Sequence, residues 1–402
     1  MIRNSTAEGT PARPVGGPAR RTVLGATALS AAALTAALPG APVAAAEGGR
    51  RELLCVGTWD GGPVYGAWFD PARGRLTPMG PVAEASSNWV AAHPRRPVLY
   101  VGGGEDGGYV RAFRVDRRTG ATKPLGEIAT DGGGTGGGGV SYLAVDGPSD
   151  TLLVANFEAG LATSLPLGRA GAPRAPLATV YDTGSGPSPR QDGPHPHQVV
   201  VAPGRRFALV PDFGADRVFA YRFDGATGAL SPSVPAGRGG FATPPGSGPR
   251  RLVFAPHGRT AYLLTELTAQ LRTLAWHPRT GTLTERQILS IDSPGFPGTR
   301  SGAELALSRD GRFVYVSSRG ENTLVVYAVA PSTGLLTPVQ RVPCGGTTPW
   351  GMALHPGGRW LLVANKASGT VNVFSVATGT GRLTDTGASM AVPDPDGFAL
   401  FT

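Results

Sequence analysis

A histidine, a glutamate and two arginines occupy matching positions of a repeat of about 50 residues in this sequence. His197 and Arg250 hold one position in consecutive repeats, and Glu266 and Arg319 hold a second position, again in consecutive repeats. A carboxylate or an imidazole can take a proton from water, and a guanidinium can bind an anion or stabilise a developing oxyanion. Brought together, these four side chains could direct water onto an ester carbonyl.

The repeat that places them is visible in six segments, in each of which a turn is followed seven positions later by the end of an apolar run. The segments are Pro94–Val101, Gly147–Val154, Pro203–Val210, Pro256–Leu263, Arg309–Val316 and Pro356–Val363. Seven runs with a period of two follow the same spacing and start at Val64, Val110, Leu161, Val218, Leu271, Leu324 and Val371. Short alternating runs repeated every 50 residues or so predict four-stranded propeller blades.

The two ends of the chain complete the count of blades. Each repeat has two halves, an anchored apolar segment followed by an alternating run. Seven alternating runs are present but only six anchored segments, so we expect Leu53–Thr58 and Phe398–Thr402 to supply the missing one together. Closure by strands from both termini removes the exposed sheet edges. The sequence therefore predicts an all-β fold, a seven-bladed β-propeller of four-stranded antiparallel blades whose ring is closed by N- and C-terminal strands. In six blades a glycine should form the hairpin turn, because this turn needs a positive φ: Gly74, Gly120, Gly228, Gly281, Gly334 and Gly381.

The first 46 residues differ in composition from the rest. Arg20 and Arg21 precede an Ala- and Leu-rich stretch, and three alanines end the segment before Glu47. This order is typical of an export signal, and twin arginines favour the Tat route. We expect residues 1–46 to be that signal, residues 47–402 to form the propeller, and the protein to be exported to the cell envelope or the outside without a stable membrane span. Retention of the segment as an anchor is the alternative.

Composition limits the partners. The formal net charge is +9, without a basic cluster that would indicate nucleic acid. A closed ring needs no partner to cover sheet edges, so a monomer is expected. Cys55 and Cys344 lie far apart in the sequence and have no metal-binding spacing; each could be a buried free thiol, or the two could pair. No cofactor or metal is expected.

Charged side chains gather at two register positions of the late repeats. The first position, six residues before each turn, holds Asn88, Ser141, His197, Arg250, Ala303 and Trp350. The second, three residues after each anchored strand, holds Gly104, Phe157, Phe213, Glu266, Arg319 and Lys366. Equivalent positions of a propeller face the same channel or rim, so these groups should converge. Alternatively, Arg250 and Glu266 form only a structural ion pair, and His197 is a satisfied core histidine.

Seven short motifs, taken in order, resemble those of a known family. They are Val56-Gly-Thr58, Gly193-Pro-His-Pro-His-Gln198, Gly248-Pro-Arg250, Thr265-Glu-Leu267, Ala303-Glu304, Ser318-Arg-Gly320 and Val363-Ala-Asn365. The set resembles the seven-bladed β-propeller lactonase family, which is typified by the propeller form of 6-phosphogluconolactonase and is related to fungal carboxymuconate cycloisomerase. The resemblance covers residues 53–402.

The resemblance implies a hydrolase that opens a sugar δ-lactone, such as 6-phosphogluconolactone or an extracellular analogue, to its aldonic acid. In that mechanism either His197 or Glu266 takes the proton from water. Arg250 and Arg319 hold an anionic group of the substrate or stabilise the oxyanion. A lactone is already an activated ester, so the reaction needs no metal.

Further positions match the family or depart from it. Arg190 and His195 match, and together with Glu304 they are expected to contact substrate. Where the family usually has histidine after Gly-Pro-Arg, this chain has Arg251, and where it usually has arginine after the proline of the last repeat, this chain has Trp350. These changes bear on which anion is bound.

Two other functions stay open. A cycloisomerase of the muconate type would use the same kind of cationic pocket. A non-catalytic propeller would instead bind a ligand or a protein across an open apolar rim, for which Trp350, Phe157 and Phe213 are the candidates.

Overall fold

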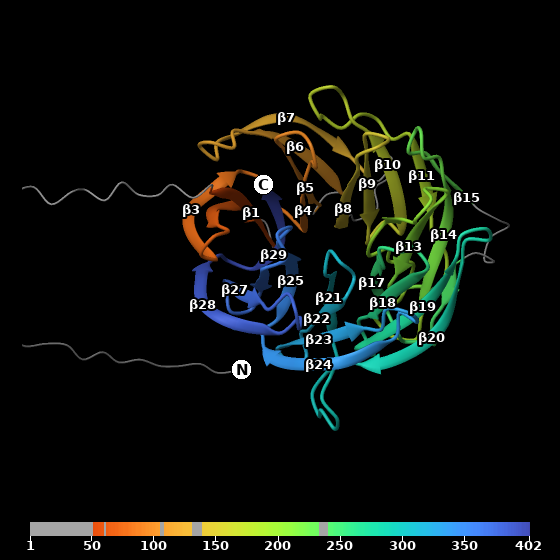
Figure 1. Ribbon diagram of the computed structural model, residues 1–402. Helices are drawn as coiled ribbons and strands as arrows, with labels where there is room; N and C mark the ends of the chain where they lie inside the picture. Colours follow the sequence, from red (N-terminus) through yellow and green to blue (C-terminus); the bar gives the residue numbers. More distant parts are fainter. Residues whose placement is uncertain (1–50, 60–61, 105–107, 131–138, 233–239) are drawn as a thin grey trace, which may run out of the picture. The chain divides into compact units, whose positions relative to one another are not determined.

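The computed structural model describes residues 51–59, 62–104, 108–130, 139–232 and 240–402. The expected export signal, residues 1–46, lies outside the described residues. The described chain forms seven antiparallel sheets that follow one another around a common centre (Figure 1). This arrangement confirms the predicted seven-bladed propeller.

Each blade is described from its innermost to its outermost strand. Blade 1 consists of β29 (Pro395–Phe401), β1 (Glu52–Thr58), β2 (Val64–Asp70) and β3 (Arg75–Ala83). Blade 2 consists of β4 (Trp89–Ala92), β5 (Val98–Gly103), β6 (Tyr109–Val115) and β7 (Thr122–Ala129). Blade 3 consists of β8 (Val140–Asp146), β9 (Thr151–Asn156), β10 (Leu161–Pro166) and β11 (Ala178–Tyr181).

The fourth blade has short strands. It consists of β12 (Val200–Val201), β13 (Phe207–Asp212), β14 (Arg217–Phe223) and β15 (Leu230–Pro232), with β16 (Phe241–Ala242) also paired to β14. Its inner strand is short because the residues between β11 and β12 form a long loop that carries Arg190, His195 and His197.

The last three blades are regular. Blade 5 consists of β17 (Pro249–Phe254), β18 (Thr260–Thr265), β19 (Gln270–His277) and β20 (Thr282–Ser290). Blade 6 consists of β21 (Gly302–Leu307), β22 (Phe313–Ser318), β23 (Thr323–Val329) and β24 (Leu336–Pro343). Blade 7 consists of β25 (Pro349–Leu354), β26 (Trp360–Asn365), β27 (Thr370–Val376) and β28 (Leu383–Ala391).

The ring closes as the sequence predicts. β29 pairs antiparallel with β1, with Leu53 opposite Phe401 and Val56 opposite Phe398. The six hairpin glycines all have φ between 67° and 80°, a region that glycine enters without a steric penalty. The third blade lacks this turn; a longer connection joins its two outer strands.

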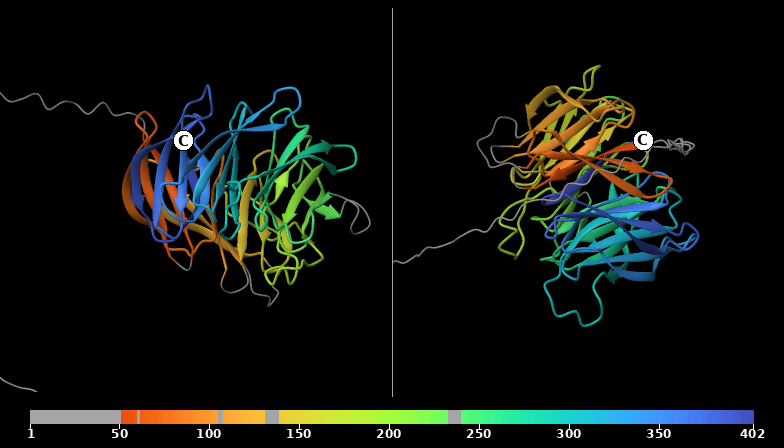
Figure 2. Two further views of the ribbon diagram at one scale, coloured as in Figure 1. Left: turned by 90° about the horizontal axis from the view of Figure 1, so that it is seen from below. Right: turned by 90° about the vertical axis from the view of Figure 1, so that its left-hand side faces the viewer.

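Apolar layers between neighbouring blades hold the ring together, and Figure 2 shows the twisted sheets from two further sides. Between blades 1 and 2, for example, Leu53 packs with Val90 and Leu99. Cys55 belongs to the same layer, and both cysteines are buried free thiols. Burial raises the pKa of the Cys55 thiol to about 12, so it is an inert core residue. No helix within the described ranges is long and apolar enough to cross a membrane.

Candidate active site

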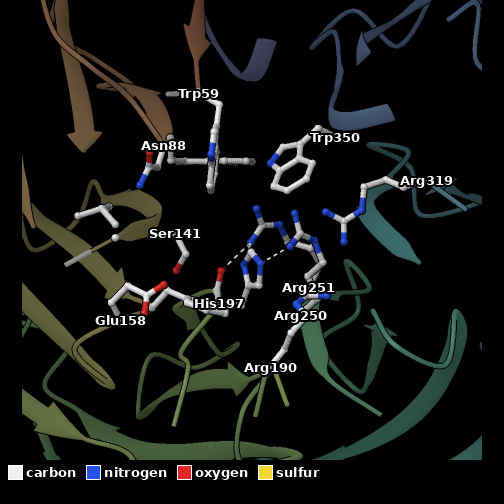
Figure 3. Close-up of a pocket in the computed structure, with 14 residues that line it drawn as sticks. Trp59, Asn88, Ser141, Glu158, Arg190, His197, Arg250, Arg251, Arg319 and Trp350 are labelled. Carbon is white, nitrogen blue, oxygen red and sulfur yellow. Dashed lines mark hydrogen bonds between the residues drawn. The ribbon is translucent and has the colours of Figure 1, made fainter. Parts of the chain in front are cut away.

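A pocket opens at the end of the ring where the inner strands begin and the second strands end. Its lining comes from six of the seven blades and the loop before β12 (Figure 3). The lining residues are Trp59, Asn88, Trp89, Gly139, Val140, Ser141, Phe157, Glu158, Arg190, His197, Arg250, Arg251, Arg319 and Trp350.

Irregular strand pairing turns three of the register residues, Ser141, Arg250 and Trp350, toward this pocket. The pairing of inner and second strands shifts at Ser141 in β8, at Arg250 in β17 and at Trp350 in β25. In β21 the shift spans Ala303 and Glu304. A bulge leaves its extra residue outside the ladder and redirects the side chain, which is why bulges recur beside functional sites. The first register position is therefore a bulge position in four blades.

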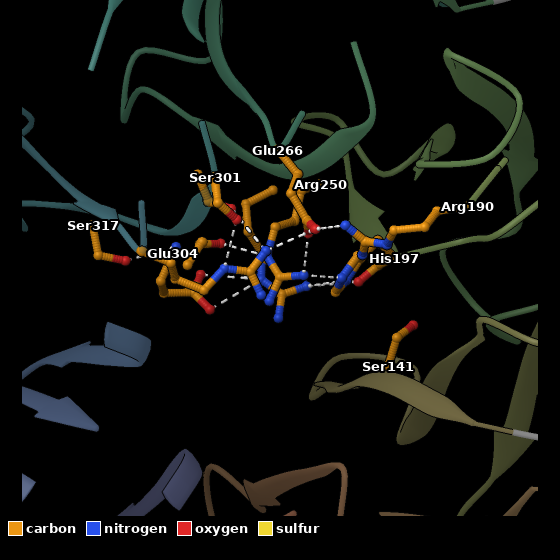
Figure 4. A network of polar contacts seen from close by, with 12 residues as sticks. Ser141, Arg190, His197, Arg250, Glu266, Ser301, Glu304 and Ser317 are labelled. Atoms are coloured by element: carbon orange, nitrogen blue, oxygen red, sulfur yellow. Dashed lines mark hydrogen bonds and ion pairs between the residues drawn. The ribbon is translucent and has the colours of Figure 1, made fainter. Parts of the chain in front are cut away.

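Glu266 is the centre of the charged cluster. Its carboxylate is 1% exposed and sits directly after β18. Oε1 lies 2.8 Å from both Arg190 Nη1 and Arg319 Nη2, and Oε2 accepts a hydrogen bond of 2.9 Å from Arg250 Nη1 (Figure 4). Burial alone would raise the pKa of Glu266, but the three guanidinium groups lower it to about 2. The carboxylate is therefore ionised and serves as the shared counter-charge of three arginines.

His197 lies between two arginines and is buried. Arg250 Nη1 contacts its Nε2, and Arg251 Nη1 lies 3.1 Å from its Nδ1 while donating to the His197 carbonyl at 2.6 Å. Burial, together with the charges of Arg250 and Arg251, holds the pKa of His197 well below its usual range. The ring is neutral, so one of its nitrogens is an acceptor. Whichever nitrogen that is, it faces a guanidinium N–H.

A second buried ion pair lies beside the first. Arg251 Nε donates to both oxygens of Glu304 at 3.1 and 3.0 Å, and its guanidinium is 4.5 Å from the ring centre of Trp89 and 5.0 Å from that of Tyr142. Glu304 thus binds Arg251 and does not line the pocket. The arginine that replaces the family's usual histidine is neutralised by this partner.

The loop before β12 brings in Arg190 but keeps His195 away from the pocket. Arg190 stacks over buried Phe213 at 4.7 Å and reaches Glu266. His195 stacks on Phe157 at 4.4 Å, and its ring nitrogens contact Phe157 O and Asp192 Oδ1, each at 3.0 Å. The structure thus places His195 behind Phe157, which itself lines the pocket.

Two tryptophans form a wall of the pocket, and one of them, Trp350, lies beside Arg319 (Figure 3). The rings of Trp59 and Trp350 lie 5.1 Å apart, and Arg319 and Arg250 approach the Trp350 ring to 4.3 and 5.4 Å. Lys366 Nζ lies 4.8 Å from the same ring. An indole face attracts cations, so Trp350, where the family usually has arginine, offers its ring to both arginines. The apolar rim that a non-catalytic binding propeller would need does not form: Phe213 is buried, and the exposed large apolar side chains among the described residues are Leu177, Tyr181 and Ile288.

The cluster carries an excess of positive charge around a buried carboxylate. Arg190, Arg250 and Arg319 share one carboxylate, Glu266, and Arg250 Nη2 is buried without a hydrogen-bond partner in the described part of the chain. A buried, unpaired guanidinium N–H is costly unless a ligand accepts its hydrogen bond. Burial and the neighbouring Arg319 charge hold the pKa of Arg250 well below its usual range, although guanidinium groups stay protonated near neutral pH. The arrangement can bind an anion or a polarised carbonyl oxygen.

Comparisons with known proteins agree with this geometry. The model of the family "Lactonase, 7-bladed beta-propeller" matches residues 53–399. The chain belongs to this lactonase family. It is 29% identical over 306 residues to a 6-phosphogluconolactonase of Bacillus subtilis, a match that covers 75% of this chain and 84% of the relative.

Solved structures place the chain in the same family of enzymes. The periplasmic gluconolactonase of Pseudomonas aeruginosa superposes with a TM-score of 0.78 at 32% identity, covering 88% of this chain and 99% of that one. A Lactobacillus plantarum protein gives a TM-score of 0.79 at 29% identity, covering 88% and 100%. Together these matches confirm the expected family and the expected activity class, a lactone hydrolase.

One acidic residue of this lactonase pocket escaped the sequence analysis. Glu158 is exposed, lines the pocket, and lies with Ser141 on the side away from Arg319 (Figure 3). No ion pair involving Glu158 is found in the described ranges. Glu158 follows the second register position, Phe157, by one residue. Comparing the next position of each repeat as well would have identified Glu158 as a candidate. Among the described residues, no three His, Cys, Asp or Glu side chains are grouped as metal ligands would be.

Proposed function

We propose that the chain hydrolyses sugar δ-lactones to aldonic acids and acts outside the cytoplasm, on 6-phosphogluconolactone or an unphosphorylated extracellular analogue. The observation that carries the proposal is the cluster of three arginines that share one carboxylate beside a pocket. Export is supported by the twin-arginine segment before Glu47 and by the similarity to a periplasmic gluconolactonase.

The arginines fit the charge that develops in the reaction. As a water oxygen bonds to the lactone carbonyl carbon, the carbonyl oxygen becomes an oxyanion, and preorganised donors in a buried site stabilise it strongly. Arg250 Nη2 is such a donor, and Arg319 lies beside it against the same indole. The tetrahedral intermediate then collapses: the bond from the carbonyl carbon to the ring oxygen breaks, and the ring oxygen becomes a hydroxyl by taking the proton that the general base removed from the attacking water.

The surroundings of Glu266 and His197 favour a positioning role over proton abstraction. A general base works best when its pKa is near the working pH, whereas the pKa of Glu266 is about 2. The acceptor nitrogen of His197 faces an arginine N–H. Glu158 is a carboxylate that lines the pocket and belongs to none of these arginine contacts. We therefore assign to Glu158 the role of general base, which takes a proton from the attacking water.

The test is a pH-stat measurement of proton release from glucono-δ-lactone and its 6-phosphate, with spontaneous hydrolysis subtracted. Because general-base assistance contributes about 10²–10⁴-fold, Glu158→Gln should lower kcat by at least about 100-fold and leave KM within a few-fold. Glu127→Gln, a change on the exposed outer strand β7, is the matched control. Full activity of Glu158→Gln would reject the assigned base, and inactivity of the wild type on every lactone would reject the function.

A further inference from the structure

A second lobe of the cleft adjoins the pocket on the side of blades 5 to 7. It shares three lining residues with the pocket, Arg190, Arg319 and Trp350. Its own lining includes the hydroxyl side chains of Thr299, Ser301 and Thr348, together with Glu266 and Gly320. We call the pocket described above the inner lobe and this second space the outer lobe.

The inner lobe is small for a complete ligand site. It encloses about 180 Å³, whereas sites for small molecules usually begin at about 300 Å³. The outer lobe is a shallow depression of about 600 Å³ that is largely open to solvent. A substrate bound at the arginines therefore has room to continue past Arg319 and Trp350.

The outer lobe is held in shape by backbone contacts. Arg319 N donates to Ser301 O at 2.7 Å, so the loop after β20 is tied to the loop after β22. A Cβ on Gly320 would lie 2.2 Å from Thr299 O, and only glycine permits this approach. The side chain of Arg319 repeats the connection, because its Nε donates to Ser301 Oγ at 3.1 Å.

Thr348 adopts a strained conformation at this lobe. Its φ is +59°, which is unusual for a β-branched residue. Its N–H donates to Asn322 Oδ1 at 2.7 Å and its carbonyl accepts from Lys366 N at 2.9 Å. Backbone strain of this kind persists where the surroundings enforce it, often at binding sites. The hydroxyls of Thr348 and Thr299 have no protein hydrogen-bond partner in the described ranges, so both can bind a ligand.

We propose that the outer lobe binds a second sugar ring attached to the lactone, so that the substrates are lactones of disaccharides or longer oligosaccharides. This inference rests on the proposed lactone hydrolysis and names its substrate class. The lobe's own residues contribute hydroxyls and, with Trp350, an indole, which suit the hydroxyls and C–H faces of a sugar. The two cations that line it, Arg190 and Arg319, are shared with the inner lobe, and both form ion pairs with Glu266. Arg319 also donates to Ser301 Oγ and Gly302 O. A glycosyl group therefore fits better than a phosphate.

The experiment compares lactobiono-δ-lactone, a disaccharide lactone, with glucono-δ-lactone on the full chain. Wild type should show a kcat/KM at least tenfold higher for the disaccharide lactone. Thr299→Trp, which fills the outer lobe from an exposed position, should reduce this ratio to about one. Thr337→Trp, an exposed change on β24, is the matched control and should keep the wild-type ratio.

Four outcomes would overturn the inference and one the function. Equal kcat/KM for both lactones in the wild type, or an unchanged ratio in Thr299→Trp, would remove the glycosyl subsite while leaving a lactonase. Selective loss of 6-phosphogluconolactone turnover in Thr299→Trp would assign the lobe to phosphate. If the wild type hydrolyses neither lactone, the proposed function fails, and calorimetric binding of lactobionate and gluconate still tests the outer lobe. Tighter binding of lactobionate that Thr299→Trp abolishes would support a glycosyl subsite, and equal binding of the two acids would reject it.

Discussion

Replacing Glu266 by glutamine removes the carboxylate that three arginines share while keeping the shape of the side chain. Each pKa unit is equivalent to about 1.4 kcal/mol, so the fall from 4.5 to about 2 is equivalent to about 3 kcal/mol of folding free energy. Removing one member of a buried ion pair typically costs about 3–5 kcal/mol. We therefore expect Glu266→Gln to lower the free energy of unfolding by about 3 kcal/mol at pH 7.

The pH dependence follows from the direction of the pKa change. A carboxylate whose folded-state pKa lies below its unfolded value stabilises the fold above the unfolded pKa, and this stabilisation is lost as the pH falls through the folded pKa. For Glu266 the window runs from just above 4.5 down to about 2. Wild type and Glu266→Gln should therefore differ most at pH 7 and converge toward pH 2.

The assay is urea unfolding of both proteins at pH 7, 5 and 3, monitored by tryptophan fluorescence and circular dichroism. Glu127→Gln is the control, because Glu127 pairs with Arg111 on the surface and such pairs contribute only about 0–1 kcal/mol. Equal stability of Glu266→Gln and wild type at pH 7 would refute the reasoning, since it would mean that the three arginines do not need this counter-charge.

Two further predictions concern the supports of the site. Asp216 accepts hydrogen bonds from Gln191 Nε2, Gly246 N and Gly248 N at 2.9, 2.6 and 2.8 Å, and so connects the segments that lead to Arg190 and Arg250. Asp216→Asn should lower kcat/KM about tenfold in pH-stat kinetics and the free energy of unfolding in urea by about 1–3 kcal/mol. Unchanged kinetics would count against this role. Burial and nearby Asp212 raise the pKa of Asp182 well above its usual value. A raised carboxyl pKa favours folding only while the group is protonated, so wild type should lose stability as the pH rises above about 4. In unfolding experiments from pH 4 to 9, Asp182→Asn should lose less stability than wild type. Parallel plots of unfolding free energy against pH for the two proteins would contradict this.

Much of the fold was predictable because its determinants are local. Alternating apolar residues and hairpin glycines recur every 50 residues or so, and each blade needs only this pattern to form. The register also predicted that Arg250, Glu266 and Arg319 converge, because equivalent positions of a closed ring face the same space. The buried free state of Cys55, one of two readings, follows from its place on an apolar strand.

Other features of the site depended on contacts that leave no periodic signal. The bulge in β21 sends Glu304 to Arg251 and away from the pocket, and a bulge shifts by one residue the pattern on which register arguments depend. The loop before β12 folds according to its own hydrogen bonds, which place Arg190 in the cluster and His195 behind Phe157. Glu158 follows a strand, where a charged residue is common on any protein surface.

The most direct test of the account is the rate of proton release from δ-lactones by wild type and Arg319→Ala, with folding confirmed by circular dichroism. Arg319 lies 2.8 Å from Glu266 and 4.3 Å from the Trp350 ring, at the junction of both lobes. Loss of one oxyanion donor costs about 10²–10³-fold in kcat, so the account predicts a fall of at least about 100-fold in a folded protein. Wild-type turnover by folded Arg319→Ala would contradict the claim that the arginine cluster performs the chemistry.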